Sequence, residues 1–365
     1  MNPAATADGR GASFQGNSPV NRRFVILTEG FSNPIRGKTG ACVIRYCRDE
    51  VVAVLDSTAV GRTSHELLGV GDVPVVGSLA DVPQGRTLLI GIALPGGQLP
   101  PAWRAIVSEA IGRGMDVVSG MHDFLADDPE MAAAAREHQV RLIDVRNQRI
   151  RHCARAQGLR DECLRIHTVG QDSSLGKMLT TKELTRALQA AGRDAKFAAT
   201  GQTGIIVEGD GYPIDCMVAD FISGAAEQLV LDHQHHEILM IEGQGSLAHP
   251  SFSGVTLGLL HGCQPHGLIL CYEAGRSTAL GLDHIPLAPL AELRRLYEQV
   301  ASLLRPCRVI GISINSRRLT AEEAAEERGR REQEFGLPVC DVLRDGPQPL
   351  VDAVLKLAAE RSSSA

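Results

Sequence analysis

Short apolar runs alternate with amphipathic segments of helical length along most of the chain, and this alternation limits the possible folds more than any other feature. In the first part of the sequence, strand-like runs occur at residues 23–30, 51–56, 73–78, 86–94, 115–120 and 141–146. Residues 101–114 have a proline near their start and a glycine at their end, as a helix often does. Such β-α alternation is typical of a parallel sheet covered by helices. The sequence therefore predicts an α/β fold.

A second series of strand-like runs follows a polar and basic segment. These runs lie at residues 163–170, 195–200, 237–243, 266–272 and 307–315, and helices are expected at 289–304, 321–335 and 350–358. The helix at 321–335 pairs Glu with Arg at i,i+4 spacing, which indicates a solvated face. A length of 365 residues suits two domains. We predict a disordered tail (1–22), a Rossmann-like N-terminal domain (23–146), a linker (147–162), a P-loop NTPase-like domain (163–358) and a tail (359–365), with mainly parallel sheets in both domains.

The charge balance and the cysteine pattern narrow the class of partner. A formal net charge of -6 argues against a nucleic-acid or anionic-membrane surface, because such surfaces need clustered Lys and Arg. No run approaches the ~20 apolar residues of a membrane span. The nine cysteines include no C-x-x-C pair, so we expect reduced thiols, no metal site and a cytoplasmic protein. The expected partners are small molecules and further copies of the chain in a homo-oligomer.

The stretch "GQDSSLGKMLTT" contains the strongest chemical signal in the chain. A strand runs into a glycine-flanked turn that opens a helix, which exposes backbone N–H groups, and Lys177 adds a full positive charge. This context predicts a phosphate seat, with a purely structural turn as the alternative. The residues expected to contact the phosphates are Gly170, Gln171, Ser173, Ser174, Leu175, Gly176, Lys177 and Met178. Nucleotide hydrolases keep Ser or Thr for magnesium where this chain has Met178.

A similar string, "GFSNPIRGKTG", occurs near the start of the chain. Six residues separate Gly30 from Gly37, and the following "ACVIRY" looks strand-like rather than helical. We therefore interpret this string as a structural loop after the first strand and expect residues 41–46 to be extended.

Three motifs of the second predicted domain resemble those of dethiobiotin synthetase and its relatives. "GQDSSLGK" resembles the G-T-D-T-x-V-G-K loop of these enzymes, and "ILMIEGQGSLAHP" resembles their strand and E-G-A-G-G turn. "VIGISINS" ends a late strand at Asn315, where these relatives place an Asn that reads adenine. The resemblance implies a P-loop domain of this type.

A closer resemblance covers residues 24–355. The segments that carry it are "GQDSSLGKMLTTKEL", "ATGQTGIIVEGDGYPID", "DFISGAAEQLV", "IEGQGSLAHPSFSGVTLGLLHG" and "GLPVCDVLRDG". They resemble a bacterial P-loop family long catalogued as a domain of unknown function, whose characterised members are D-glutamate N-acetyltransferases that use acetyl-CoA. By that likeness Met178 is a family trait, whereas Gln171 replaces the Thr of many relatives.

The resemblance implies transfer of an acetyl group from acetyl-CoA to the α-amine of an amino acid, D-glutamate or a related D-amino acid. The chemistry of the loop agrees with it, because a thioether is no ligand for hard Mg²⁺ and a coenzyme A pyrophosphate needs only to be held. The alternative is an ATP-dependent, dethiobiotin-synthetase-like kinase or ligase that uses magnesium and acts on a carboxylate or carbamate. A third class is a protein that binds a nucleotide or coenzyme without catalysis.

Acetyl transfer needs a neutral amine and donors for the developing oxyanion. Glu242, at the end of a strand beside the loop, is the first candidate for the base or amine-orienting group, and His249 is the alternative. Asp172 is expected to orient the loop or the amine. The expected substrate-binding side chains, which would contact a carboxylate, are Thr200, Gln202, Thr203 and Arg276. We expect no metal at His233, His235 and His236, because their spacing places no i,i+4 pair on one helix face.

Overall fold

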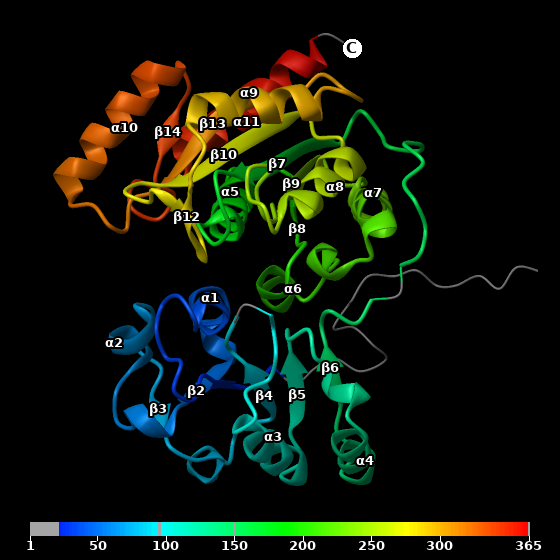
Figure 1. Ribbon diagram of the computed structural model, residues 1–365, viewed down its shortest axis with the longest axis vertical. Coiled ribbons are helices and arrows are strands. Elements are labelled where there is room, and N and C mark those ends of the chain that lie inside the picture. The colour runs from blue at the N-terminus through cyan, green and yellow to red at the C-terminus, as the bar shows by residue number, and fades with distance from the viewer. Residues whose placement is uncertain (1–21, 94–95, 149, 364–365) are drawn as a thin grey trace, which may run out of the picture. The chain divides into compact units, whose positions relative to one another are not determined.

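The computed structural model describes residues 22–93, 96–148 and 150–363, and the chain forms two compact α/β units. Each unit contains a six-stranded parallel sheet (Figure 1). The predicted α/β class with a Rossmann-like first sheet is confirmed by this topology. Nearly all of the expected tail at 1–22 lies outside the described residues. Among the described residues, no helix combines the length and the apolar character that a membrane crossing requires.

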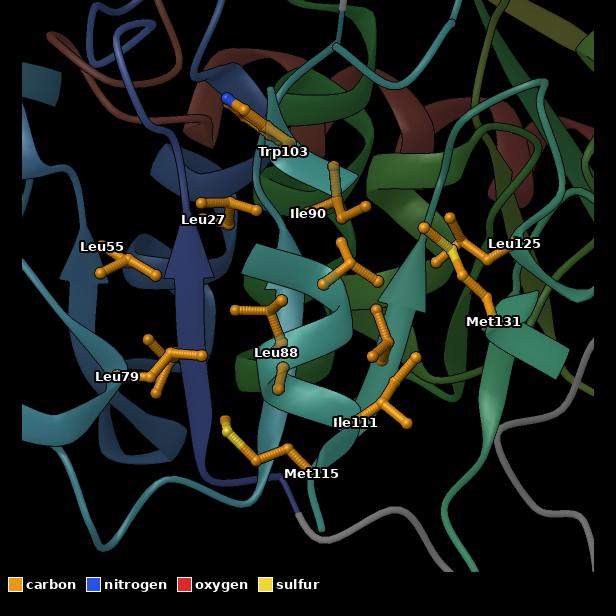
Figure 2. Packing of buried hydrophobic residues seen from close by; sticks show 14 of the residues in the cluster. Leu27, Leu55, Leu79, Leu88, Ile90, Trp103, Ile111, Met115, Leu125 and Met131 are labelled. Carbon is orange, nitrogen blue, oxygen red and sulfur yellow. The ribbon is translucent and has the colours of Figure 1, made fainter. Parts of the chain in front are cut away.

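The first unit has the strand order β3-β2-β1-β4-β5-β6. All of its neighbouring strands run parallel, so the chain must cross the sheet between them, mostly through helices. The strands are β1 (Phe24–Leu27), β2 (Val51–Leu55), β3 (Val75–Val76), β4 (Thr87–Ile90), β5 (Asp116–Ser119) and β6 (Leu142–Asp144), and the helices are α1 (Lys38–Tyr46), α2 (Ser64–Leu68), α3 (Trp103–Gly112) and α4 (Pro129–Glu137). Figure 2 shows Leu27, Leu88 and Ile90 of β1 and β4 beside Trp103 and Ile111 of α3 in one buried cluster.

Helix α1 corrects the expectation that residues 41–46 are extended. Thr39, Gly40, Val43 and Ile44 are buried at helical spacing, so they form one face of α1. Gly40 lets that face approach the sheet, because an added Cβ would lie 2.8 Å from a methyl carbon of Ile26. The buried residues of this segment therefore follow the period of a helix. In so short a run this period is difficult to distinguish from the alternation of a strand, which is why the prediction was wrong.

A segment of the second half of the sequence packs with the first unit. Gln202–Cys216 contains helix α6 (Gln202–Glu208) and a 3-10 turn (Ile214–Cys216), and it belongs to the compact unit formed by the described residues up to 148. Arg146 pairs with Asp215, and the Thr39 and Thr203 hydroxyls share a hydrogen bond of 2.9 Å. The predicted domain limits place this segment in the second domain, whereas the structure places it in the first unit. Its local sequence pattern does not indicate which hydrophobic core it joins.

The second unit has the strand order β14-β13-β10-β7-β9-β8, with helices on both faces (Figure 1). Its strands are β7 (Leu164–Gly170), β8 (Ala195–Ala198), β9 (Ile238–Ile241), β10 (Gly267–Glu273), β13 (Arg308–Asn315) and β14 (Val339–Cys340), and β11 (Thr278–Ala279) pairs with β12 (Leu282–Pro286) as an antiparallel hairpin. Its helices are α5 (Lys177–Ala190), α7 (Ile222–His233), α8 (Ser253–Cys263), α9 (Leu290–Ala301), α10 (Ala321–Phe335) and α11 (Gln348–Ser362). Helix α11 continues four residues beyond 358, so the last turn of a helix occupies most of the expected tail.

Two apolar clusters hold helices against the central sheet of the second unit. One cluster joins the sheet to α5 and α11 through Leu184, Leu188 and Val354. The other joins it to α8 and α9 through Leu260 and Tyr297. The central strands are buried on both faces, so the carboxyl ends of β7, β9, β10 and β13 meet at one rigid edge.

Candidate functional site

The predicted phosphate loop lies between β7 and α5. Gly176 caps the helix with φ +117°, a conformation that side chains rarely tolerate, and no side chain bonds to the first turn from this cap. The first intrahelical bond runs from the Thr180 N–H to the Gly176 oxygen. The N–H groups of the first turn have no intrahelical partner, and the helix dipole places partial positive charge there. This geometry suits a bound anion.

Lys177 lies across the loop with a side chain that is only 6% exposed. Its Nζ donates to the main-chain oxygen of Asp172 at 2.7 Å. Two glycines make room for the lysine: a Cβ at Gly170 would lie 3.1 Å from Nζ, and one at Gly243 would lie 2.9 Å from Cδ. A side chain at either glycine would crowd the stem of Lys177.

Asp172 is fully buried, and both of its carboxylate oxygens have partners. Oδ1 accepts from the Ser173 N–H at 2.6 Å, and Oδ2 accepts from the Leu280 N–H and from Arg276 Nη1, each at 2.8 Å. These bonds tie the loop to the β11–β12 hairpin. Asp172 therefore joins the loop to the hairpin, and neither of its carboxylate oxygens is turned to solvent.

Arg276 lies between two carboxylates instead of projecting into open space. Its side chain is 8% exposed, Nη1 bonds to Asp172 and to the Ser173 oxygen at 2.9 Å, and Nη2 pairs with Glu273. Glu273 also accepts from Arg317 at 2.7 Å and from Arg318 at 2.8 Å. Burial alone would raise the pKa of Glu273, but the bonds from the arginines outweigh it and hold that pKa below its usual value. Arg276 was expected to bind a substrate carboxylate, and in the structure its guanidinium binds the carboxylates of Asp172 and Glu273.

Glu242 follows β9 and is 4% exposed. Its Oε2 accepts from the N–H groups of Thr200 at 2.9 Å and Gly201 at 3.2 Å. The Thr200 hydroxyl donates back to the Glu242 main-chain oxygen at 2.8 Å and accepts from Gln244 at 3.1 Å. These bonds fix the carboxylate at the same edge of the sheet as the loop and join Glu242 to Thr200.

Gln202 and Thr203 follow Thr200 in sequence, but both belong to α6 and pack within the first unit. The Gln202 side chain lies against Gly120, where a Cβ would come within 1.6 Å of its Oε1. The structure thus separates the roles of three residues that the sequence places in one motif: Thr200 contacts Glu242, whereas Gln202 and Thr203 anchor α6.

His249 is 2% exposed and has both ring nitrogens in polar contacts. Nδ1 accepts from the Ser251 N–H at 3.1 Å, which assigns the proton to Nε2. Nε2 lies 3.4 Å from the Leu280 oxygen and 3.6 Å from Asp172 Oδ1. Nδ1 of His249 is therefore engaged as a hydrogen-bond acceptor within the folded chain.

Asn315 and Gln171 attach the loop to neighbouring segments. Asn315 Nδ2 donates to the Leu175 oxygen at 3.1 Å, and Gln171 Nε2 donates to the Ala288 oxygen at 2.9 Å. Asn315, expected to read adenine, thus lies at the loop itself. Ser174, the exposed residue of the loop, has φ +55° and adds to its tight curvature.

The hydroxyl groups nearest to Met178 are bonded within the protein. Thr180 shares a hydrogen bond of 2.8 Å with Ser313, and Thr181 shares one of 2.9 Å with Thr168 and donates to the Lys177 oxygen at 2.8 Å. Both carboxylate oxygens of Asp172 are also bonded within the protein.

Sequence reasoning missed two contributors to the loop. Tyr297 of α9 donates its hydroxyl to the Gly170 oxygen at 2.8 Å and accepts from the Leu247 N–H at 3.2 Å, and burial raises the pKa of this phenol to about 12. Leu280 acts through its main chain, at the turn of the hairpin. Tyr297 could have been found from the sequence, because it is a single tyrosine on the apolar face of an amphipathic helix and a buried tyrosine hydroxyl needs a hydrogen-bond partner. Main-chain contacts from a hairpin leave no such signal.

Two family models match the chain. The P-loop domain of DUF1611, a domain of unknown function, matches residues 152–351, and the Rossmann-like DUF1611_N domain matches residues 57–148. A solved structure of a DUF1611 family protein from Anabaena variabilis is similar with a TM-score of 0.87 and 38% identity, and the match covers 92% of this chain and 100% of that one.

Two curated relatives are similar in sequence. A protein of Pseudoalteromonas sp. named D-glutamate N-acetyltransferase is 42% identical over 267 residues, which are 73% of this chain and 80% of that protein. A protein of the same name from Tritonibacter scottomollicae is 40% identical over 270 residues, 74% of this chain and 81% of that protein. The expectation of a P-loop family with a Rossmann-like N-terminal domain is thereby confirmed.

Proposed function

Because this chain belongs to the DUF1611 family, we propose that it is an N-acetyltransferase that moves an acetyl group from acetyl-CoA to the α-amine of an amino acid. Two relatives about 40% identical carry the name D-glutamate N-acetyltransferase, which supports the reaction class and makes D-glutamate the first acceptor to test.

The observation that carries this proposal is the loop around Lys177. It offers the uncapped N-terminus of α5 and one buried ammonium group, while the position that would bind magnesium holds Met178 and the nearby threonine hydroxyls are bonded elsewhere. An N-terminal helix turn and a lysine suffice to hold the diphosphate of coenzyme A. Cleavage of a nucleoside triphosphate would also require a metal that bridges its phosphates.

In the proposed reaction, the neutral acceptor nitrogen attacks the thioester carbonyl carbon, an N–C bond forms, and the C–S bond breaks. The nitrogen loses a proton as the amide forms, the leaving thiolate takes up a proton to become the free thiol, and the acceptor ammonium has already lost one proton before attack. Glu242 is the residue proposed to take or orient that proton, because its carboxylate is fixed beside the loop by two main-chain N–H groups. Asp172, with both oxygens bonded, keeps the loop in shape.

The test uses the purified full-length chain with acetyl-CoA and a panel of D- and L-amino acids. Release of free thiol is followed over time, the acetylated product is identified by mass spectrometry, and a reaction without acceptor measures hydrolysis of the thioester. We expect thiol release that depends on an amino acid, with D-glutamate among the accepted substrates. Absence of thiol release with every acceptor would refute the acetyltransferase proposal.

A parallel reaction with ATP, magnesium and the same panel addresses the ATP-dependent alternative suggested by the dethiobiotin-synthetase-like motifs. We expect no ADP above the enzyme-free blank. We also expect coenzyme A, without metal, to raise the melting temperature. ADP formation that depends on an acceptor would favour the kinase or ligase instead.

A further inference from the structure

A cluster of N–H donors lies at the edge of the second sheet opposite the loop, where the amino ends of β7, β10 and β13 meet. Arg165 is the second residue of β7, His266 directly precedes β10, and Arg305 lies three residues before β13. Arg165 and Gly170 are five residues apart on β7, which at about 3.3 Å per residue places the cluster about 17 Å from the loop. The cluster is therefore separate from the site described above.

His266 has donor groups at both of its ring nitrogens. The Arg165 main-chain N–H donates to Nδ1 at 3.0 Å, so Nδ1 carries no proton. Burial, followed by the charges of Arg165, Arg361 and Arg305, lowers the pKa of His266 to about 2, so the ring is neutral and its single proton is on Nε2. Arg165 Nη2 lies 3.4 Å from Nε2, and Arg305 Nη1 lies 3.2 Å from it. A guanidinium group only donates, so two guanidinium donors face a third donor, the Nε2–H.

Arg165 carries a buried positive charge that no carboxylate of the described chain approaches within ion-pair distance. Its guanidinium donates to three main-chain oxygens, those of Arg160, Cys163 and Gln264. The carboxylate of Asp161 pairs with Arg305 instead, at 2.5 Å. Burial, followed by the charge of Arg305, lowers the pKa of Arg165 to about 10. Because a buried cation without a counter-ion is costly, the cluster favours a ligand with negative charge.

Two further buried N–H donors in this region have no hydrogen-bond partner among the described residues. They are Arg305 Nε and Gln264 Nε2. Gln264 is 7% exposed, and its main-chain oxygen is the one that Arg165 Nε contacts at 3.1 Å, so Gln264 lies directly beside the cluster. Buried polar groups in proteins are normally hydrogen-bonded. An excess of donors around a buried charge is therefore typical of a place where an anion binds.

We propose that this cluster binds a small inorganic oxyanion, phosphate or sulfate, between His266 Nε2, Arg165 Nη2 and Arg305 Nη1. A tetrahedral oxyanion offers several acceptor oxygens to donors in different directions, and charge-assisted hydrogen bonds are the strong ones. The side chain of Arg305 is 21% exposed and that of Asp161 is 66% exposed, so these two residues form the solvent side of the cluster. The anion enters from that side, in competition with the Asp161 carboxylate. This inference is independent of the proposed acetyltransferase function.

The test uses Lys177→Ala as the background, because the loop is itself a proposed phosphate seat. Isothermal calorimetry with sodium phosphate, and separately with sodium sulfate, measures the dissociation constant at a fixed concentration of sodium chloride. Adding Arg305→Gln should weaken binding of the anion about tenfold or more, because it removes a charge-assisted hydrogen bond. Arg308→Gln is the matched control: its side chain is 57% exposed and pairs with Glu360 at the start of β13, so it should bind the anion as the background does.

A second pair of variants predicts a change in the opposite direction. Asp161→Asn removes the carboxylate that competes for Arg305, so it should tighten anion binding about two- to fivefold, the range of an exposed ion pair. Glu162→Gln, at the exposed neighbouring position, removes the same charge and should change the affinity less. A purely structural role of Arg305 would not make the loss of its ion-pair partner improve anion binding.

The melting temperature of the background should also rise with the concentration of phosphate or sulfate, because a ligand that binds only the folded chain stabilises it. Absence of binding by both anions, or equal affinity in Arg305→Gln and Arg308→Gln, would overturn the proposal. If Arg305→Gln does not fold, as circular dichroism shows, the comparison of Asp161→Asn with Glu162→Gln decides alone, and equal affinity in that pair would overturn the proposal. The acetyltransferase proposal is tested by thiol release and stands or falls separately.

Discussion

The ammonium group of Lys177 donates to the main-chain oxygen of Asp172 at 2.7 Å, so the lysine closes the loop on which it lies. The same oxygen belongs to the residue whose carboxylate ties the loop to the β11–β12 hairpin. A phosphate at the N-terminus of α5 can compete for this ammonium group, because a charged acceptor forms a stronger hydrogen bond than a carbonyl oxygen. Anion binding is therefore expected to involve a change of partner at Lys177.

Lys177→Ala is expected to weaken coenzyme A binding about 10- to 100-fold, because it removes one charge-assisted hydrogen bond from the phosphate seat. Isothermal calorimetry with coenzyme A measures the dissociation constant. Lys356→Ala, which removes a lysine from the exposed face of α11, is the control and should bind as the wild type does. Equal affinity in the wild type and Lys177→Ala would show that the phosphates lie elsewhere.

Met178→Ser restores the hydroxyl that nucleotide hydrolases have at this position. We expect it to leave acetyl transfer nearly unchanged, because residue 178 lies in the first turn of α5 and offers the anion its main-chain N–H, which serine retains. It should not create magnesium-dependent ATP hydrolysis, since Thr180, Thr181 and Asp172 remain bonded within the protein. A coupled assay for ADP measures this. ATP hydrolysis by the wild type itself would contradict our interpretation of Met178.

The loop was predictable because its signal is local. The strand, the glycine at the left-handed cap and the lysine that starts α5 all occur between Gly170 and Lys177, so their spacing alone specifies the turn. The seat for an anion follows from that backbone. Residues 41–46 lacked such a marker, and a run of six residues is too short to distinguish the period of a helix from that of a strand.

The partners of the site side chains were not predictable because they come from distant parts of the chain. Arg276 lies 104 residues from Asp172, and nothing in the sequence says that this guanidinium is already paired. Thr200 and Thr203 are three residues apart in one motif, yet they join different compact units. Local sequence patterns predict the conformation of the backbone. The ion pairs of a site depend on which strands are neighbours in the sheet, and this is not visible in a local pattern.

Glu242→Gln is expected to lower kcat about 10²- to 10⁴-fold if Glu242 is the general base. The amide oxygen of glutamine can still accept from the N–H groups of Thr200 and Gly201, so the KM for acetyl-CoA and the melting temperature should change little. Glu292→Gln, on the exposed face of α9, is the control for loss of one carboxylate. A kcat equal to that of the wild type would leave Glu242 only the task of ordering the backbone at residues 200 and 201.

His167 of β7 should make the folded protein sensitive to acid. Burial, assisted by the charge of Lys177 and opposed by the bond to the Ile241 oxygen, lowers the pKa of His167 from 6.5 to about 4. Above pH 6.5 both the folded and the unfolded chain keep this imidazole neutral. Between pH 6.5 and about 4 only the unfolded chain takes up the proton, so the free energy of unfolding falls with pH.

The difference between 6.5 and about 4, at about 1.4 kcal/mol per pH unit, amounts to about 3 kcal/mol. His167→Leu should remove this part of the acid dependence, which denaturant unfolding at a series of pH values from 7 to 4 measures. Burial lowers the pKa of His266 to about 2, so His266 also makes the free energy of unfolding fall in acid. Some acid sensitivity should therefore remain in His167→Leu. His284→Leu, on the exposed strand β12, should retain the full slope of the wild type. An equal fall in the free energy of unfolding from pH 7 to 4 in His167→Leu and the wild type would contradict this prediction. It would mean that His167 has the same pKa in the folded and the unfolded chain.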